Sequence, residues 1–82
     1  MKEFLYFSAT WCGPCKILGP TMQQLAAEGM TVRKIDIDQD PNTPSQYNVR
    51  SVPTVILLQN GKEMSRQVGT QPKDTYINMW NN

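Results

Sequence analysis

The chain has 82 residues, of which 39% are hydrophobic and 18% charged, and its formal net charge is +1. This length supports one modest core, so we expect residues 1–82 to form a single domain, and the mixed composition argues against a disordered tail. Basic residues are dispersed along the chain, which argues against a nucleic-acid-binding surface. Apolar runs such as residues 55–58 are far shorter than the ~20 residues of a membrane helix, and the run after Lys2 is too short for a secretory signal. The sequence therefore predicts a soluble, cytoplasmic protein.

The first half of the chain predicts a strand, a helix and a second strand. Residues 4–7 are typical of a short buried strand. Pro14 favours the first turn of a helix, Pro20 is predicted to kink that helix, and Gly29 is predicted to end it. Residues 32–37 predict a strand that runs parallel to the first, because a helix connects the two. The apolar positions of the helix are Leu18, Met22, Leu25 and Ala26.

The second half predicts a hairpin and a last helix. The turn-forming residues 40–44 lead into a short helical turn near residues 46–49. A strongly β-forming run at 54–58 is followed by Asn60-Gly61, which predicts an antiparallel partner strand near 63–68. A helix from about Pro72 has an apolar face formed by Tyr76, Ile77 and Trp80. The order β-α-β-(α)-β-β-α indicates an α/β fold.

The two cysteines stand close together, in Cys12-Gly13-Pro14-Cys15. A disulfide between them closes a very small loop and adds little stability, whereas cytosolic disulfides tend to be transient and catalytic. On the first turn of a helix, residues at this spacing are close enough to form a disulfide, and the same spacing is kept when the bond is open. Because a helix N-terminus favours an anion, we expect Cys12 to be the more exposed thiol that attacks and Cys15 the buried thiol that resolves.

Metal, haem and purely structural roles are the alternatives to redox chemistry for this motif. A zinc centre needs about four ligands, and the chain has no histidine and no third cysteine, so no metal site is expected within one subunit. Haem attachment needs histidine where Lys16 stands. Two inert core cysteines stay open as an alternative, although their placement behind Trp11 argues against it. Asp36, Asp38 and Asp40 lack the glycine and glutamate of a calcium loop and predict a solvated strand end and turn.

The hexapeptide Trp11-Cys12-Gly13-Pro14-Cys15-Lys16 resembles the active-site signature of the thioredoxin family. The resemblance covers nearly the whole chain and implies a minimal thioredoxin fold. This fold is a four-stranded mixed sheet flanked by helices, without the extra N-terminal strand and helix that full-length members carry. The further matches are Pro20, Ile37-Asp38-Gln39, Arg50-Ser51-Val52-Pro53-Thr54, Asn60-Gly61-Lys62 and Val68-Gly69.

The resemblance also implies an activity, the reduction of protein disulfides by dithiol exchange. The chain would bind no cofactor and would use its redox-active disulfide Cys12–Cys15, with electrons from NADPH through thioredoxin reductase. Clients would be protein disulfides, including that of ribonucleotide reductase, and the protein would act as a monomer. The alternatives are a disulfide oxidant or isomerase, and a non-redox binding subunit of a larger complex.

The resemblance assigns roles to individual residues. It implies a cis peptide before Pro53, with the backbone of Val52 pairing with an extended client and with Trp11 partly exposed. Tyr6 stands where the family has a buried aspartate, and Lys34 matches the family lysine beside that aspartate. In the family this carboxylate is thought to help deprotonate the resolving thiol. The departure leads to the hypothesis that the mixed disulfide is resolved more slowly, with Tyr6 or water partly replacing this proton transfer. The supporting residues are Trp11, Gly13, Pro14, Lys16, Pro53, Tyr6 and Lys34, and the client-binding residues are Trp11, Val52, Pro53 and Gly69.

Overall fold

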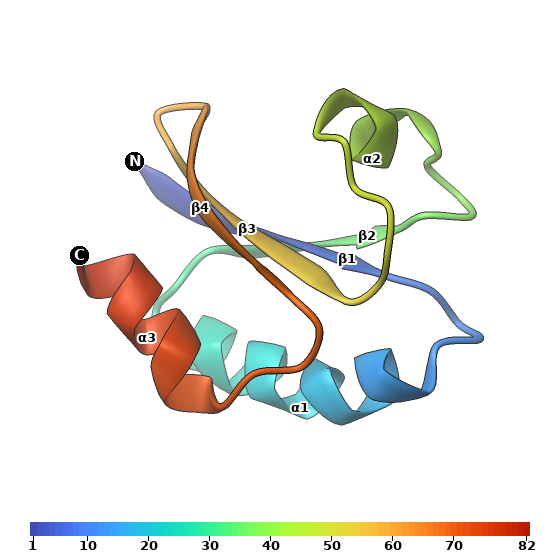
Figure 1. Ribbon diagram of the computed structural model, residues 1–82. Coiled ribbons are helices and arrows are strands. Elements are labelled where there is room, and N and C mark those ends of the chain that lie inside the picture. Colours follow the sequence, from blue (N-terminus) through green and yellow to red (C-terminus); the bar gives the residue numbers. More distant parts are fainter.

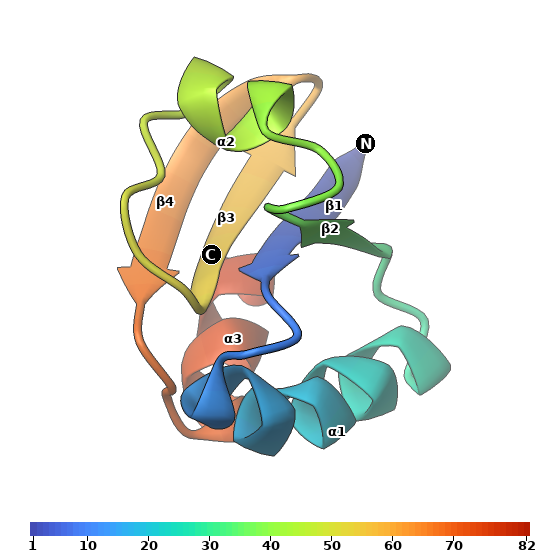
Figure 2. The same cartoon turned by 90° about the vertical axis from the view of Figure 1, so that its right-hand side faces the viewer.

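The computed structural model describes residues 1–82 and contains one four-stranded mixed sheet in the order β2-β1-β3-β4. Helices α1 and α3 cover one face of this sheet and α2 covers the other, as Figures 1 and 2 show from two directions. The predicted α/β order is confirmed. No helix combines the length and the apolar character needed to cross a membrane. The elements are β1 (Lys2–Ser8), α1 (Gly13–Ala27), β2 (Val32–Asp36), α2 (Asn42–Gln46), β3 (Thr54–Gln59), β4 (Lys62–Val68) and α3 (Lys73–Asn81).

Strand β1 lies at the centre of the sheet. It pairs in parallel with β2, as the connection through α1 predicts, and antiparallel with β3, a pairing that was not predicted from the sequence. The hairpin between β3 and β4 turns at Asn60 and Gly61, whose φ angles are 54° and 82°. Two consecutive residues with positive φ are what a tight hairpin turn requires, and this is why the Asn-Gly pair predicted the turn correctly.

The hydrophobic core is split between the two faces of the sheet, because successive side chains of β1 and β3 point to opposite sides. Phe4 and Tyr6 of β1 pack with Leu18 and Met22 of α1 on one face, and Leu5 and other apolar side chains pack beneath α2 on the other. This explains the continuous apolar run in β1, which is buried on both sides. The second cluster consists of Leu5, Phe7, Ile35, Ile56 and Leu58.

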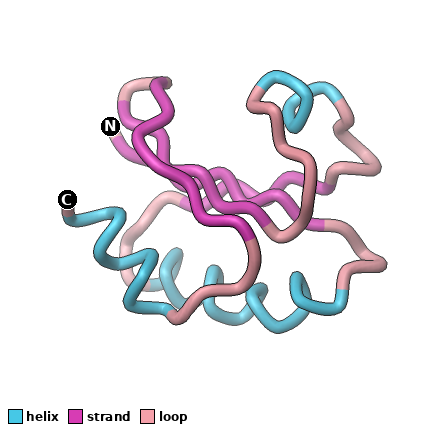
Figure 3. Tube along the Cα trace, in the orientation of Figure 1, coloured by secondary structure: helices cyan, strands magenta, loops and turns pink.

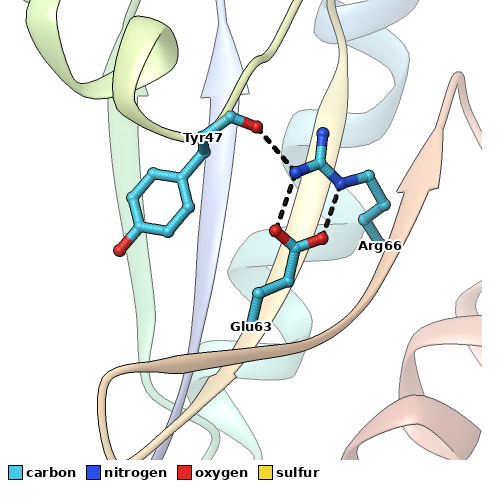
Figure 4. A network of polar contacts seen from close by, with 3 residues as sticks. All are labelled: Tyr47, Glu63 and Arg66. Carbon is cyan, nitrogen blue, oxygen red and sulfur yellow. Dashed lines mark hydrogen bonds and ion pairs between the residues drawn. The ribbon is translucent and has the colours of Figure 1, made fainter.

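Helix α2 is joined to β4 by a polar network (Figure 4). The guanidinium of Arg66 donates two hydrogen bonds of 2.7 Å to the carboxylate of Glu63 and a third, also 2.7 Å, to the carbonyl of Tyr47. Tyr47 caps the C-terminus of α2, where a cation is favourable. The hydrogen bonds from Arg66 hold the pKa of Glu63 below its usual value.

The position of α2 corrects one prediction. We expected a helical turn near 46–49, but the helix occupies Asn42–Gln46. The reason is Asp40, whose Oδ1 accepts the backbone N–H groups of Asn42 at 3.2 Å and Thr43 at 3.1 Å. This is the helix-capping role of an aspartate, and Pro41 directly after it suits a helix start.

The apolar faces of the long helices also differ from the prediction in detail. Ala26 is exposed, and the buried positions of α1 are Cys15, Leu18, Met22 and Leu25. In α3 the buried residues are Tyr76 and Met79, whereas Ile77 and Trp80 are partly buried at the rim of the core. The sequence correctly predicted that Tyr76 is buried. It missed Met79, which follows three residues later on the same helical face.

Candidate active site

The two cysteines form a disulfide at the N-terminus of α1, with Cα atoms 5.3 Å apart. Cys12 is the N-cap residue, and its Sγ accepts the backbone N–H of Cys15 at 3.2 Å. The expectation that Cys12 is the more exposed of the two is wrong for this disulfide, because each residue is 4% exposed. Ala9 lies in the same buried cluster, and Ile37 and Val52 pack against it.

The loop before β3 lies against the disulfide. The Val52-Pro53 peptide is cis, which confirms the prediction, and Pro53 is fully buried. The carbonyl of Pro53 accepts the N–H of Gly69 at 2.8 Å, and Gly69 has a φ of 84°, a conformation that favours glycine. One residue later, the hydroxyl of Thr70 donates to the carbonyl of Pro14 at 3.2 Å.

Three loops therefore meet at one end of the sheet (Figure 3). One follows β1 and carries the cysteine motif, one precedes β3 and carries the cis proline, and one follows β4 and carries Gly69. The structure thus brings together the residues that the resemblance selected from separate parts of the sequence. Gly13, Pro14 and Lys16 are exposed beside the disulfide on the first turn of α1.

Trp11 is 66% exposed, which agrees with the expected partial exposure. Its indole Nε1–H donates to Oδ2 of Asp38 at 2.8 Å, so the exposed ring is held in a defined orientation. Sequence reasoning placed Asp38 in a turn and missed this contact. The signal that could have found it is the pairing of β1 with β2, because each of the two residues follows the end of its strand.

Tyr6 lies beneath the first turn of α1. Its hydroxyl donates to the carbonyl of Cys15 at 2.8 Å, and the residue is 3% exposed. Burial raises the pKa of Tyr6, which keeps the phenol protonated. Lys34 is the register partner of Tyr6 on β2, and its side chain is exposed. Tyr6 therefore contacts the backbone of the second cysteine, with Lys34 beside it.

Comparisons with known proteins agree on one family. The family model described as Thioredoxin matches residues 2–82. The thioredoxin of Chlamydia trachomatis is 49% identical over 75 residues, which are 89% of this chain and 74% of that protein. The thioredoxin of Rickettsia conorii is 42% identical over 78 residues, covering 92% of this chain and 74% of that protein. A solved mutant thioredoxin from Halobacterium salinarum superposes with a TM-score of 0.90 at 37% identity, covering 95% of this chain and 70% of that one.

Proposed function

Because the chain belongs to the thioredoxin family and is a thiol–disulfide oxidoreductase, we propose that it reduces protein disulfides through Cys12 and Cys15. The thiolate of Cys12 attacks one sulfur of a client disulfide, and the other client sulfur leaves as a thiolate. The thiolate of Cys15 then attacks Sγ of Cys12. The client is released with both sulfurs reduced. It has gained two electrons from the protein, which is left oxidised with a Cys12–Cys15 disulfide.

The observation that carries this assignment is the position of Cys12 at the N-cap of α1. Its Sγ accepts a backbone N–H at 3.2 Å, and it lies at the positive end of a helix of 15 residues. Both features stabilise a thiolate on Cys12 relative to a thiol. Cys15 lies within the helix, which makes it the partner that acts second.

The client surface is proposed to surround the disulfide. Trp11 offers an exposed aromatic ring, and Val52 packs against the buried cysteines. The proposal is that the backbone of Val52 pairs with an extended client segment. The hydrogen bond between Gly69 and Pro53 supports this role, because it ties together the two loops that flank the client.

The remaining parts of the proposal rest on the family. We infer that residues 1–82 act as one domain and as a monomer in the cytoplasm. The chain carries electrons without a bound cofactor, and the oxidised protein is returned to the dithiol by a thioredoxin reductase that draws on NADPH. Ribonucleotide reductase is one candidate client.

Trapping experiments test the roles of the two cysteines. Cys15→Ser removes the resolving thiol, so this variant should accumulate a mixed disulfide with an oxidised single-disulfide peptide, detected by intact-protein mass spectrometry. Cys12→Ser is the matched control and should trap none. Trapping by Cys12→Ser instead would reverse the assignment. A cellular function that survives the double Cys12→Ser/Cys15→Ser substitution would identify a binding subunit without redox turnover.

A further inference from the structure

A cavity of about 490 Å³, open to the surface, lies between α1 and the edge of the sheet formed by β1 and β2. Cys15 is one of the residues that line it. Most of the others are polar or charged, so the cavity is suited to hold water. Among all the lining residues, Asp36 is the one with a carboxylate. The side chains relevant to proton transfer are Tyr6, Ser8, Cys15, Lys16, Lys34 and Asp36.

The strand register explains why Asp36 shares a cavity with Cys15. In the parallel pair of β1 and β2, Tyr6 is opposite Lys34 and Ser8 is opposite Asp36. Because side chains alternate along a strand, these four point to the same face of the sheet. That face is the one covered by α1, since Tyr6 belongs to the cluster that contains the buried side chains of α1.

The carboxylate of Asp36 is held in place by its own turn. Oδ1 accepts the backbone N–H groups of Asp38 at 2.9 Å and of Gln39 at 3.4 Å. The second carboxylate oxygen makes no hydrogen bond within the protein, and the residue is partly buried. One oxygen of a fixed carboxylate is therefore free to bind water in the cavity.

Resolution requires a proton acceptor, because Cys15 attacks as a thiolate and a thiol normally keeps its proton at neutral pH. The hydroxyl of Tyr6 already donates its proton to the carbonyl of Cys15. Lys16 and Lys34 are cations without an acceptor atom. We propose that Asp36 accepts the proton of Cys15, through water in this cavity, when Cys15 resolves the mixed disulfide.

The Cys15 proton passes to water, and water passes a proton to Asp36. The Cys15 thiolate forms a bond to Sγ of Cys12, the bond from Cys12 to the client sulfur breaks, and the client leaves as a thiolate. Asp36 later loses its proton to solvent. No further oxidant or reductant is consumed, because the electron pair moves within the thiol–disulfide exchange.

The charges around Asp36 define the pH response. Lys16 faces the cavity from α1 and Lys34 from β2. Tyr6 faces it from β1 as a neutral phenol. Asp38 and Asp40 follow in the turn and carry the same sign of charge as Asp36.

The inference rests on the proposed roles of the cysteines, and one stopped-flow experiment separates the two. Reduced protein reacts with dithiobis(nitrobenzoate), and a first nitrothiobenzoate leaves when Cys12 attacks. A second leaves when Cys15 resolves. In Asp36→Asn, Oδ1 still accepts the turn N–H groups, so the fold is retained. The first phase should be unchanged, and the second should slow about tenfold near neutral pH. Above about pH 9, where a thiol ionises unaided, the second phase should recover.

Asp40→Asn is the matched control, because it removes the same charge from the same turn, keeps an oxygen to cap α2 and does not line the cavity. Its second phase should follow that of the wild type. If Asp36→Asn has the wild-type pH profile, or if both variants slow equally, the role of Asp36 is overturned while the two phases still support the dithiol mechanism. If the wild type shows no second phase, both the resolving role of Cys15 and the inference fail.

Discussion

Replacing Tyr6 by Phe removes one buried hydrogen bond and keeps the aromatic ring. The hydroxyl lies 2.8 Å from the carbonyl of Cys15, and Tyr6 is 3% exposed, so the hydrogen bond is buried. The carbonyl lies within α1 and keeps its helical partner, which limits the expected loss to about 1 kcal/mol. With a urea m-value of about 1 kcal/mol/M for a domain of this size, the unfolding midpoint should fall by about 1 M.

The assay is urea unfolding of the oxidised protein, followed by circular dichroism, with the m-value compared between variants. Tyr47→Phe is a suitable control, because the structure shows no hydrogen bond from the Tyr47 hydroxyl and the ring is only partly buried. Its midpoint should shift by less than about 0.5 M. An unchanged or higher midpoint for Tyr6→Phe would refute the reasoning that this hydroxyl anchors the first turn of α1.

Four further substitutions have defined outcomes. Leu25→Ala empties a fully buried site in the main core and should cost about 2–5 kcal/mol in urea unfolding. Gly69→Val forces a branched side chain into a φ of 84° and should cost at least about 1–2 kcal/mol in the same assay. Arg66→Met frees Glu63 and should cost about 1 kcal/mol at neutral pH. The pKa of Glu63 is lower in the folded protein than its usual value of 4.5. The stability that the ionised Glu63 contributes is therefore fully present above pH 4.5 and is lost as the pH falls through the pKa of the folded state. The difference in stability between Arg66→Met and wild type should accordingly shrink in acid. Tyr6→Asp places a carboxylate beneath Cys15 and should change the pH dependence of client reduction, at a stability cost of about 3 kcal/mol or more.

Each of these predictions has a contradicting result. Midpoints within error of wild type for Leu25→Ala or Gly69→Val would mean that the core or the loop relaxes around the change. A difference for Arg66→Met that stays constant between neutral and acidic pH would exclude the contribution of Glu63. An unaltered pH profile of turnover for Tyr6→Asp would end the hypothesis that the residue at this position affects resolution.

Much of the fold could be predicted because its signals are local. The two-sided apolar run in β1 and the Asn60-Gly61 turn each depend on residues adjacent in sequence. The start of α2 was equally local and was missed, because Asp40-Pro41 was interpreted as a turn, whereas Asp40 accepts the first backbone N–H groups of the helix that begins at Asn42. Met79 was missed because the apolar face of α3 was assigned to Ile77 and Trp80, whereas packing against the core buries the side that carries Tyr76 and Met79.

The site was predictable only in part. The spacing of Cys12 and Cys15 on a helix N-terminus is a local signal, and the disulfide confirms their proximity. The equal burial of the two cysteines depends on Ile37 and Val52, which arrive from distant segments. The cavity that joins Asp36 to Cys15 depends on the register of β1 against β2, which no local pattern reveals.

The equilibrium reduction potential of the Cys12–Cys15 pair, measured in a defined dithiothreitol buffer, tests the proposed direction of electron flow most directly. The two-electron potential decides whether the dithiol gives electrons to a client disulfide or takes them. A reductase should have a value near the cytosolic poise or more reducing, about −220 mV or lower. A strongly oxidising value, near about −120 mV, would contradict the account and indicate a disulfide oxidant or isomerase.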